Sequence, residues 1–391
     1  MGRGKVFHDA GYTYTDRYSG RQVRQLTNFL GHSYGLYFTD ERWYNNNRSM
    51  IFTADRDNAS NFFSCDLDTG IVTQLTDSQS TAHLRGTLCP ANNCFYYWPG
   101  DKVMELNLAT LEERVIYTVP PTMINRTSGS ITADGKYVIL LIQEKVEAKG
   151  VSFSYSQFEA LFHARPFSQI MRIEIATGKA EVIHEDRCYM GHLNTSPRRP
   201  ELLTFCHEGP WSWVDQRMWG LDILTGKCWK LRPQNDENLA IGHEYWFADG
   251  EHVGYHGRPR EGHGRHLYGF CRWDDTEHVE VEFPFFSAHF HSLDRSLIVG
   301  DGNPSFAAEG KPFIQLFKWN GEKYVGPKIL AFHRSSFCDQ HAHPHPAISP
   351  DGKYVFYNSD LTGYSNVYMV EIGDFDSLPD ADQHTVVANL S

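Results

Sequence analysis

Short runs of alternating apolar and polar residues recur along this chain of 391 residues, and turn residues separate them. Such runs predict β-strands with one buried face, because successive side chains of a strand point to opposite sides. Between many of them stands an Asp-Gly pair with apolar flanks, as at Asp134-Gly135 and Asp351-Gly352, which predicts tight hairpins. The pattern as a whole predicts an all-β fold.

A second turn, Asp-x-x-Thr-Gly or a relative of it, follows strands at Asp66–Gly70, Glu174–Gly178 and Asp222–Gly226. Together the two turns recur every ~40–50 residues, which is the period of propeller blades. We therefore expect a seven-bladed β-propeller that forms a single domain over residues 1–391. The blades are expected to begin near residues 35, 82, 128, 190, 240, 288 and 340.

Two segments do not fit this repeat. Residues 16–27 resemble the turn and outer strand at residues 66–76, although no blade precedes them. We expect this segment to add an outer strand to the last blade and so close the ring. Residues 143–167 are longer than the repeat allows, which predicts a surface insertion with a short helix at Gln157–Phe162.

Composition and charge narrow the possible functions. A formal net charge of -12, with no run of Lys or Arg, argues against a nucleic-acid partner. We expect a cytoplasmic protein without a membrane partner, because the first residues lack a signal-like apolar core and no segment reaches the ~20 apolar residues of a membrane span. The eight cysteines form no CxxC pair and are expected to be reduced.

The densest candidate chemistry lies at residues 339–346, where His341, His343 and His345 alternate with other residues. In an extended strand these three imidazoles share one face and can converge on a divalent cation. The alternative is a polar loop whose histidines bond to backbone groups.

Other histidines follow a small residue at the expected blade starts. If the first strand of each blade lines a central channel, these side chains point toward one axis, whereas a stabilising polar ring is the alternative. His289 lies one blade before the residue 340 cluster and is expected to reach the same cation, with His291 as its rival. The histidines of this set are His32, His83, His192, His243, His289 and His343.

An arginine and two tryptophans stand out in residues 206–219. A guanidinium is permanently charged and forks onto carboxylates, so Arg217 suits recognition of an acidic substrate. A salt bridge to Asp215 or Glu208 is its structural alternative. Trp211 and Trp213 offer flat faces to a sugar ring, or else pack between blades.

These segments together resemble oligogalacturonate lyase, a family of seven-bladed propeller lyases. The resemblance covers most of the chain and is most specific in residues 188–220, 241–250, 287–302 and 340–368. It implies that short oligogalacturonides are cleaved by β-elimination to unsaturated uronides, in pectin degradation. It also implies Mn²⁺ or another divalent first-row cation, held by His289, Gln340, His343 and His345.

The resemblance further implies that Arg217 is the catalytic base and His243 the acid, and we expect His192, His207 and Trp211 to contact substrate. The chemistry of the residues alone favours Arg217 as a carboxylate clamp, because arginine resists deprotonation. His243 titrates in the range that suits an acid. The alternative function is a non-catalytic, protein-binding propeller of the translocation-protein type, whose repeats carry the same turns.

Overall fold

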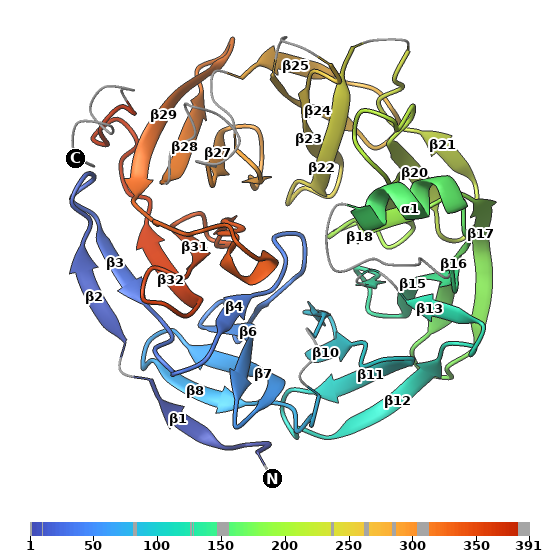
Figure 1. Ribbon diagram of the computed structural model, residues 1–391, viewed down its shortest axis with the longest axis horizontal. Coiled ribbons are helices and arrows are strands. Elements are labelled where there is room, and N and C mark those ends of the chain that lie inside the picture. The colour runs from blue at the N-terminus through green and yellow to red at the C-terminus, as the bar shows by residue number, and fades with distance from the viewer. Residues whose placement is uncertain are drawn as a thin grey trace. The chain divides into compact units, whose positions relative to one another are not determined.

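The computed structural model describes residues 2–9, 11–80, 84–125, 127, 129–146, 156–235, 238–261, 266–283, 287–302 and 313–381. Their strands form seven antiparallel sheets, the blades of a seven-bladed β-propeller, as the repeat predicts (Figure 1). The backbone groups into two compact units, which are described separately. One comprises residues 1–38, 42–84 and 281–391, and the other comprises residues 39–41 and 85–280.

The first unit contains three sheets. One has the order β1-β8-β7-β6-β4, with β5 beside β6. Its strands are β1 (Val6–His8), β4 (Ser33–Gly35), β5 (Trp43–Tyr44), β6 (Ser49–Arg56), β7 (Ala59–Asp66) and β8 (Ile71–Gln74). The next comprises β26 (Phe290–His291), β27 (Leu297–Gly300), β28 (Ile314–Trp319) and β29 (Tyr324–Ala331). The third comprises β2 (Tyr12–Thr15), β3 (Gln22–Gln25), β30 (Ala347–Ile348), β31 (Tyr354–Ser359) and β32 (Asn366–Glu371).

The second unit contains the other four sheets. Two of them comprise β9 (Gly86–Cys89), β10 (Cys94–Tyr97), β11 (Lys102–Asn107) and β12 (Glu113–Thr118), then β13 (Met123–Asn125), β14 (Ser130–Ile131), β15 (Tyr137–Glu144), β16 (Phe167–Glu174) and β17 (Ala180–Arg187). The remaining two comprise β18 (Met190–Thr195), β19 (Leu202–His207), β20 (Met218–Asp222) and β21 (Cys228–Lys230), then β22 (Ala240–Trp246), β23 (His252–Arg258), β24 (Leu267–Arg272) and β25 (Val279–Glu282).

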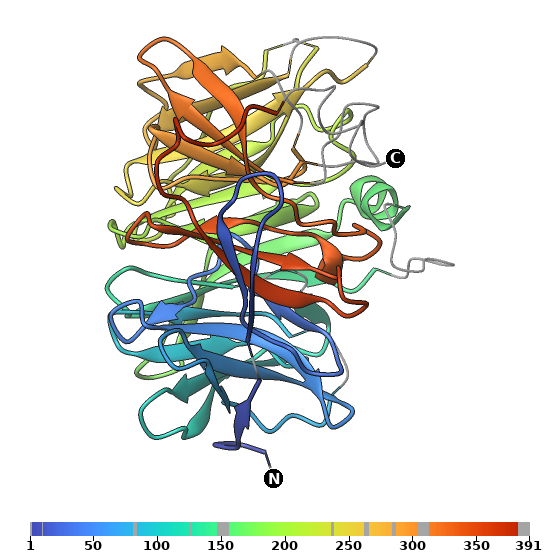
Figure 2. The ribbon, with the colours of Figure 1, turned by 90° about the vertical axis from the view of Figure 1, so that its left-hand side faces the viewer.

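The N-terminal segment completes the last sheet, as predicted. β3 pairs with β32, and Val23 lies opposite Val370 (Figures 1 and 2). β2 pairs in turn with β3, so the sheet has the order β2-β3-β32-β31-β30. Because strands from the two ends of the chain share one ladder, the outer edge of β32 is covered instead of exposed.

The turns at Asp66 and Asp222 are held by the same hydrogen bonds to the aspartate side chain. In the turn after β7, the Asp66 carboxylate accepts hydrogen bonds from the backbone N–H of Asp68 and Thr69, at 3.1 and 2.8 Å. Gly70 then adopts a φ of 73°, which glycine reaches without steric cost. The turn at Asp222 repeats this bonding with Leu224 and Thr225.

Helix α1 (Ser156–Ala164) lies within the expected insertion and contains the predicted helix at Gln157–Phe162. The preceding residues 147–155, like His83, lie outside the described part of the chain. In Figure 2, α1 stands off the strands of its own unit. Within the described residues, no helix has the length and apolar character needed to cross a bilayer.

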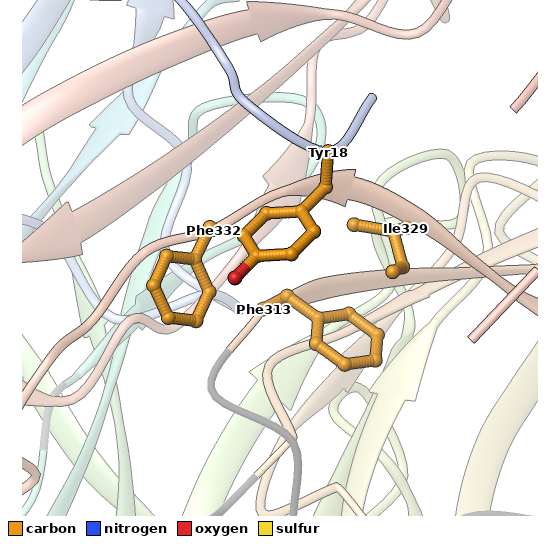
Figure 3. A pocket seen from close by; sticks show the side chains of 4 residues that line it. All are labelled: Tyr18, Phe313, Ile329 and Phe332. Carbon is orange, nitrogen blue, oxygen red and sulfur yellow. The ribbon is translucent and has the colours of Figure 1, made fainter. Parts of the chain in front are cut away.

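A small apolar pocket lies in the first unit, where the turn after β2 meets β29. Figure 3 shows the side chains that line it, Tyr18, Phe313, Ile329 and Phe332. They leave no space for a water molecule between them. This pocket is therefore a packing contact, and the candidate chemistry lies elsewhere.

Candidate functional site

Three histidines converge in the first unit. His289 lies just before β26, and His343 and His345 follow the 3₁₀ turn η1 (Gln340–Ala342). Each offers a ring nitrogen that lies within 4.8 Å of those of the other two. The ring centroids of His289 and His345 are 4.2 Å apart, and those of His289 and His343 are 5.5 Å apart. This spacing allows three imidazoles to share one cation.

The segment that carries two of them is a turn and not the expected strand. The Asp339 side chain caps η1 by accepting a hydrogen bond from the His341 N–H, at 2.9 Å. The turn breaks the alternation of side chains, so the His341 ring stacks on Tyr34 with centroids 4.2 Å apart. The expectation that His341, His343 and His345 share one face is therefore wrong for His341.

Asn358 of β31 holds the backbone of this segment. Its side-chain amide donates to the His343 carbonyl at 3.2 Å, and its own N–H donates to the Pro344 carbonyl at 2.8 Å. His345 has a φ of 42°, a left-handed conformation that costs a residue other than glycine about 1–3 kcal/mol. Such strain persists only where the surrounding contacts fix it, and here it orients the His345 ring.

A buried carboxylate positions the third histidine. Asp301 is fully buried, and its Oδ2 lies 2.7 Å from His289 Nδ1 while its Oδ1 accepts the His289 backbone N–H at 2.9 Å. A histidine whose Nδ1–H donates to a carboxylate keeps the lone pair on Nε2, the usual arrangement of a metal-binding histidine. Sequence analysis missed Asp301, although the pairing of β26 with β27 places it opposite His289.

The structure also separates His289 from its rival. His291 Nδ1 accepts the Ile348 backbone N–H at 3.1 Å, and burial, with Arg42 nearby, lowers the pKa of His291 to about 3. His291 is therefore committed to a backbone contact and His289 to the cluster. Gln340 starts η1 with an exposed side chain, and no contact found among the described residues joins that side chain to the histidines.

The donor set fits a first-row divalent cation. Burial, with His289 beside it, lowers the pKa of His343 to about 4, so its imidazole is neutral near pH 7. Within the described residues, His343 Nδ1 is buried without a hydrogen-bond partner. Neutral imidazoles suit first-row divalent ions such as manganese, iron, cobalt and zinc.

A cluster of buried charges occupies the second unit. The Arg217 side chain is 1% exposed, and it donates from Nη1 to Glu208 Oε1 at 2.8 Å and from Nε to Glu244 Oε2 at 3.1 Å. Burial opposes the charge of Arg217, but Cys206, Glu208 and Glu244 outweigh it and hold its pKa well above the ordinary value. Burial likewise opposes the charge of Glu208, but Arg217 lowers the pKa of this carboxyl strongly.

Two of the predicted histidines join this cluster at equivalent bulges. His192 in β18 and His243 in β22 have φ values of 47° and 52°, and each lies where the strand register shifts. His192 Nε2 lies 3.3 Å from Glu208 Oε2. His243 Nδ1 lies 3.0 Å from Nε2 of His256, which is paired with Gly242 across the ladder.

Trp211 connects the bulge of β22 to the arginine. Its ring lies 5.0 Å from the His243 ring and 5.4 Å from the Arg217 guanidinium. It packs so closely on Gly242 that a Cβ there would lie 2.2 Å from the indole. The structure thus brings together His192, Trp211, Arg217 and His243, and adds Glu208, Glu244 and His256.

His207 points away from this cluster. It precedes Glu208 in the chain, and its ring stacks on Trp219 with centroids 4.7 Å apart. Its ring nitrogen, Cys188 and Asp186 lie within 4.8 Å of one another. Its predicted contact with substrate therefore stays a prediction, without support from its neighbours.

Known proteins match the whole architecture. A model of the oligogalacturonate lyase family matches residues 1–376. The oligogalacturonide lyase of Pectobacterium atrosepticum is 26% identical over 386 residues, which cover 96% of this chain and 99% of that protein. The oligogalacturonate lyase of Dickeya dadantii is also 26% identical, over 389 residues and the same shares of both chains.

Two solved structures of oligogalacturonate lyases also match this chain. An oligogalacturonate lyase in complex with manganese matches with a TM-score of 0.86 and 27% identity, over 97% of this chain and 99% of that one. The oligogalacturonate lyase of Vibrio parahaemolyticus matches with a TM-score of 0.87 and 26% identity, over 95% and 99%. Because the family model matches residues 1–376 of the 391 in this chain, the chain belongs to the oligogalacturonate lyase family and is a lyase.

Proposed function

We propose that this chain cleaves short oligogalacturonides by metal-dependent β-elimination to unsaturated uronides. The observation that carries the proposal is the convergence of His289, His343 and His345, with His289 held by Asp301, in a member of this lyase family. The manganese complex of a similar lyase supports Mn²⁺ or another first-row divalent cation. Gln340 is the proposed fourth ligand.

The chemical problem is the weak acidity of the C5 proton of a uronate. A cation on the neighbouring carboxylate supplies Lewis-acid stabilisation of the negative charge that develops when this proton leaves. His289, His343 and His345 would hold that cation, and Asp301 fixes the tautomer of His289.

We assign proton transfer to Arg217 and His243. In the proposed reaction Arg217 takes the C5 proton, the C4–O bond breaks, and His243 protonates the leaving oxygen. The ion pairs with Glu208 and Glu244 oppose this role, because they stabilise the protonated guanidinium. Arg217 therefore has to release its own proton to solvent before it takes the C5 proton, a step that both ion pairs oppose; otherwise it binds the uronate carboxylate as a clamp.

His192, Trp211 and His207 are the proposed substrate contacts. His192 and Trp211 adjoin Arg217 and His243, which supports their assignment. Trp211 is flanked by Arg217 and by Arg258, whose guanidinium lies 5.1 Å from the indole, so two cations approach this ring.

The test is an ultraviolet assay for unsaturated uronide, combined with metal analysis of the purified protein. Short oligogalacturonides are expected to yield the absorbing product, chelator to abolish the reaction, and Mn²⁺ to restore it. Hydrolysis to saturated sugars would contradict elimination. No reaction with any uronide would favour the non-catalytic, protein-binding propeller.

We further propose that the protein acts in the cytoplasm, without a nucleic-acid or membrane partner. The net charge of -12 supports the absence of a nucleic-acid partner. Fractionation of the producing cells tests the location, and recovery of the protein with membranes would contradict it.

A further inference from the structure

The two tryptophans of the loop between β19 and β20 have opposite surroundings. Trp211 is half-buried and packs against Gly242, His243, His256 and two guanidinium groups. Trp213 is 41% exposed, and it is the one tryptophan among the large exposed hydrophobic side chains of the described residues. The exposed part of this indole is apolar area that a ligand can cover.

The loop around Trp213 is held rigidly. Arg260 donates three hydrogen bonds to backbone carbonyls, two of which flank Trp213 directly: Nη1 to Ser212 at 3.1 Å and Nη2 to Val214 at 2.8 Å. The third, from Nε, goes to Leu239 at 3.1 Å. The Trp213 N–H closes a turn by donating to the Pro210 carbonyl at 2.8 Å. These hydrogen bonds fix the backbone on both sides of Trp213 and so hold the indole in one position.

Helix α1 supports the same indole from the other side. The rings of Phe162 and His163 lie 5.8 and 5.3 Å from that of Trp213. Phe162 also packs on Gly209, where a Cβ would lie 2.6 Å from its ring, and the φ of 153° at Gly209 favours glycine. The insertion therefore braces the loop that carries Glu208, Trp211 and Arg217.

We propose that the exposed face of Trp213 is a sugar-binding platform for an acidic oligosaccharide, adjoining the Arg217 cluster on the same loop. This inference rests on the proposed function and adds a subsite to it. A rigid indole offers apolar area to the C–H face of a pyranose at low entropic cost. Carboxylates of the same chain gain from the positive charge of Arg258, which lies behind Trp211.

The platform contacts a sugar unit beside the reacting one, so its contribution grows with chain length. Trp213→Ala is expected to raise KM roughly fivefold to tenfold for tetragalacturonide, with less effect on digalacturonide. Trp213→Phe keeps a flat ring and should recover most of the affinity. Tyr12→Ala is the matched control, because Tyr12 is a 60% exposed aromatic residue of the other unit.

Binding is measured separately from activity, by ligand-observed NMR of tetragalacturonide with chelator-treated protein. Weaker saturation transfer to Trp213→Ala than to wild type, with Tyr12→Ala unchanged, supports the platform even if no elimination is detected. Absence of lyase activity with retained, Trp213-dependent binding would refute the proposed function alone. Equal losses for all chain lengths, or wild-type protein that binds no uronide, would overturn the platform.

Discussion

The histidine cluster of the first unit and the arginine cluster of the second differ in the charges that they bury. The first brings three imidazoles together, with no full charge of opposite sign between them among the described residues, and burial lowers the pKa of one of them, His343, to about 4. The second collects full charges, with one guanidinium between two buried carboxylates. Burying charges costs several kcal/mol per ion unless they are paired, so the second cluster must be complete in order to be stable.

This contrast shows where each cluster is open to a ligand. Imidazole nitrogens within 4.8 Å of one another gain from an added cation. In the second cluster the guanidinium already lies between two carboxylates, and an acidic substrate must compete with Glu208 and Glu244 for it. The first cluster is therefore arranged to bind a cation, whereas the charged groups of the second are already paired with one another.

The largest effect is expected from His343→Ala, which removes a proposed ligand. Metal content should fall to a small fraction of the wild-type value, and turnover roughly a thousandfold or more. His341→Ala is the matched control, since that ring stacks on Tyr34 and lies outside the cluster. Metal analysis and the ultraviolet assay check both variants, and retention of metal by His343→Ala would remove it from the ligand set.

Arg217→Lys tests the second cluster. If Arg217 takes the C5 proton, kcat should fall roughly 10²- to 10⁴-fold while substrate still binds, because an ammonium keeps the charge but not the fork geometry. If Arg217 is a clamp, the loss should appear mainly in KM. We predict the former, and steady-state kinetics at verified metal content decide it; a near-normal kcat would rule out the base.

Asp301→Asn weakens the support of His289 without removing a ligand. The amide keeps the shape but loses the charge that fixes Nδ1–H, so metal affinity should fall roughly 10- to 100-fold. Metal titration followed by calorimetry measures this. Ser296→Ala is a nearby control, because its hydroxyl contacts Asp294 in the turn between β26 and β27 and not the cluster. Unchanged affinity in Asp301→Asn would show that the carboxylate has no such role.

Glu244→Gln sharpens the question of the base. Removing one of the two carboxylates lowers the pKa of Arg217, so the rise of kcat with pH should move down by roughly one pH unit if Arg217 is the base. Glu280→Gln is the control, since Glu280 forms an equivalent pair with Arg232 in the same unit, 2.6 Å apart. A profile that does not move speaks for the clamp.

The smallest effect is a shared sensitivity to acid. Burial lowers the pKa of His333 in the first unit and of His207 in the second to about 4, from an ordinary 6.5. Between these values the unfolded chain binds protons that the folded chain does not, so stability is full above pH 6.5 and falls as the pH drops toward 4.

Replacing either histidine by Gln should flatten the fall of Tm between pH 6.5 and 4 by a similar amount in each unit. Thermal unfolding at several pH values measures it. A slope that neither substitution changes would show that other groups control acid stability.

Much of this protein is determined by its sequence. The period of the turns predicts seven blades, the Asp-x-x-Thr-Gly turns form as local hydrogen bonding requires, and residues 16–27 supply an outer strand of the last sheet. The histidines next to small residues and the segment around Arg217 identify the candidate chemistry. Each of these signals lies within a short stretch of the chain, so it can be recognised in the sequence without the tertiary structure.

Only the tertiary structure decided between neighbouring histidines and found the charged partners. Spacing favours His289 and leaves His291 as its rival; in the fold His291 accepts the Ile348 backbone N–H, whereas the His289 ring lies beside those of His343 and His345. The turn at Gln340–Ala342 redirects His341, whereas Asp301 and Glu244 gain their roles from residues 12 and 27 positions away. Such roles depend on which strands pair and on which side chains lose water together, and neither is encoded in a local pattern.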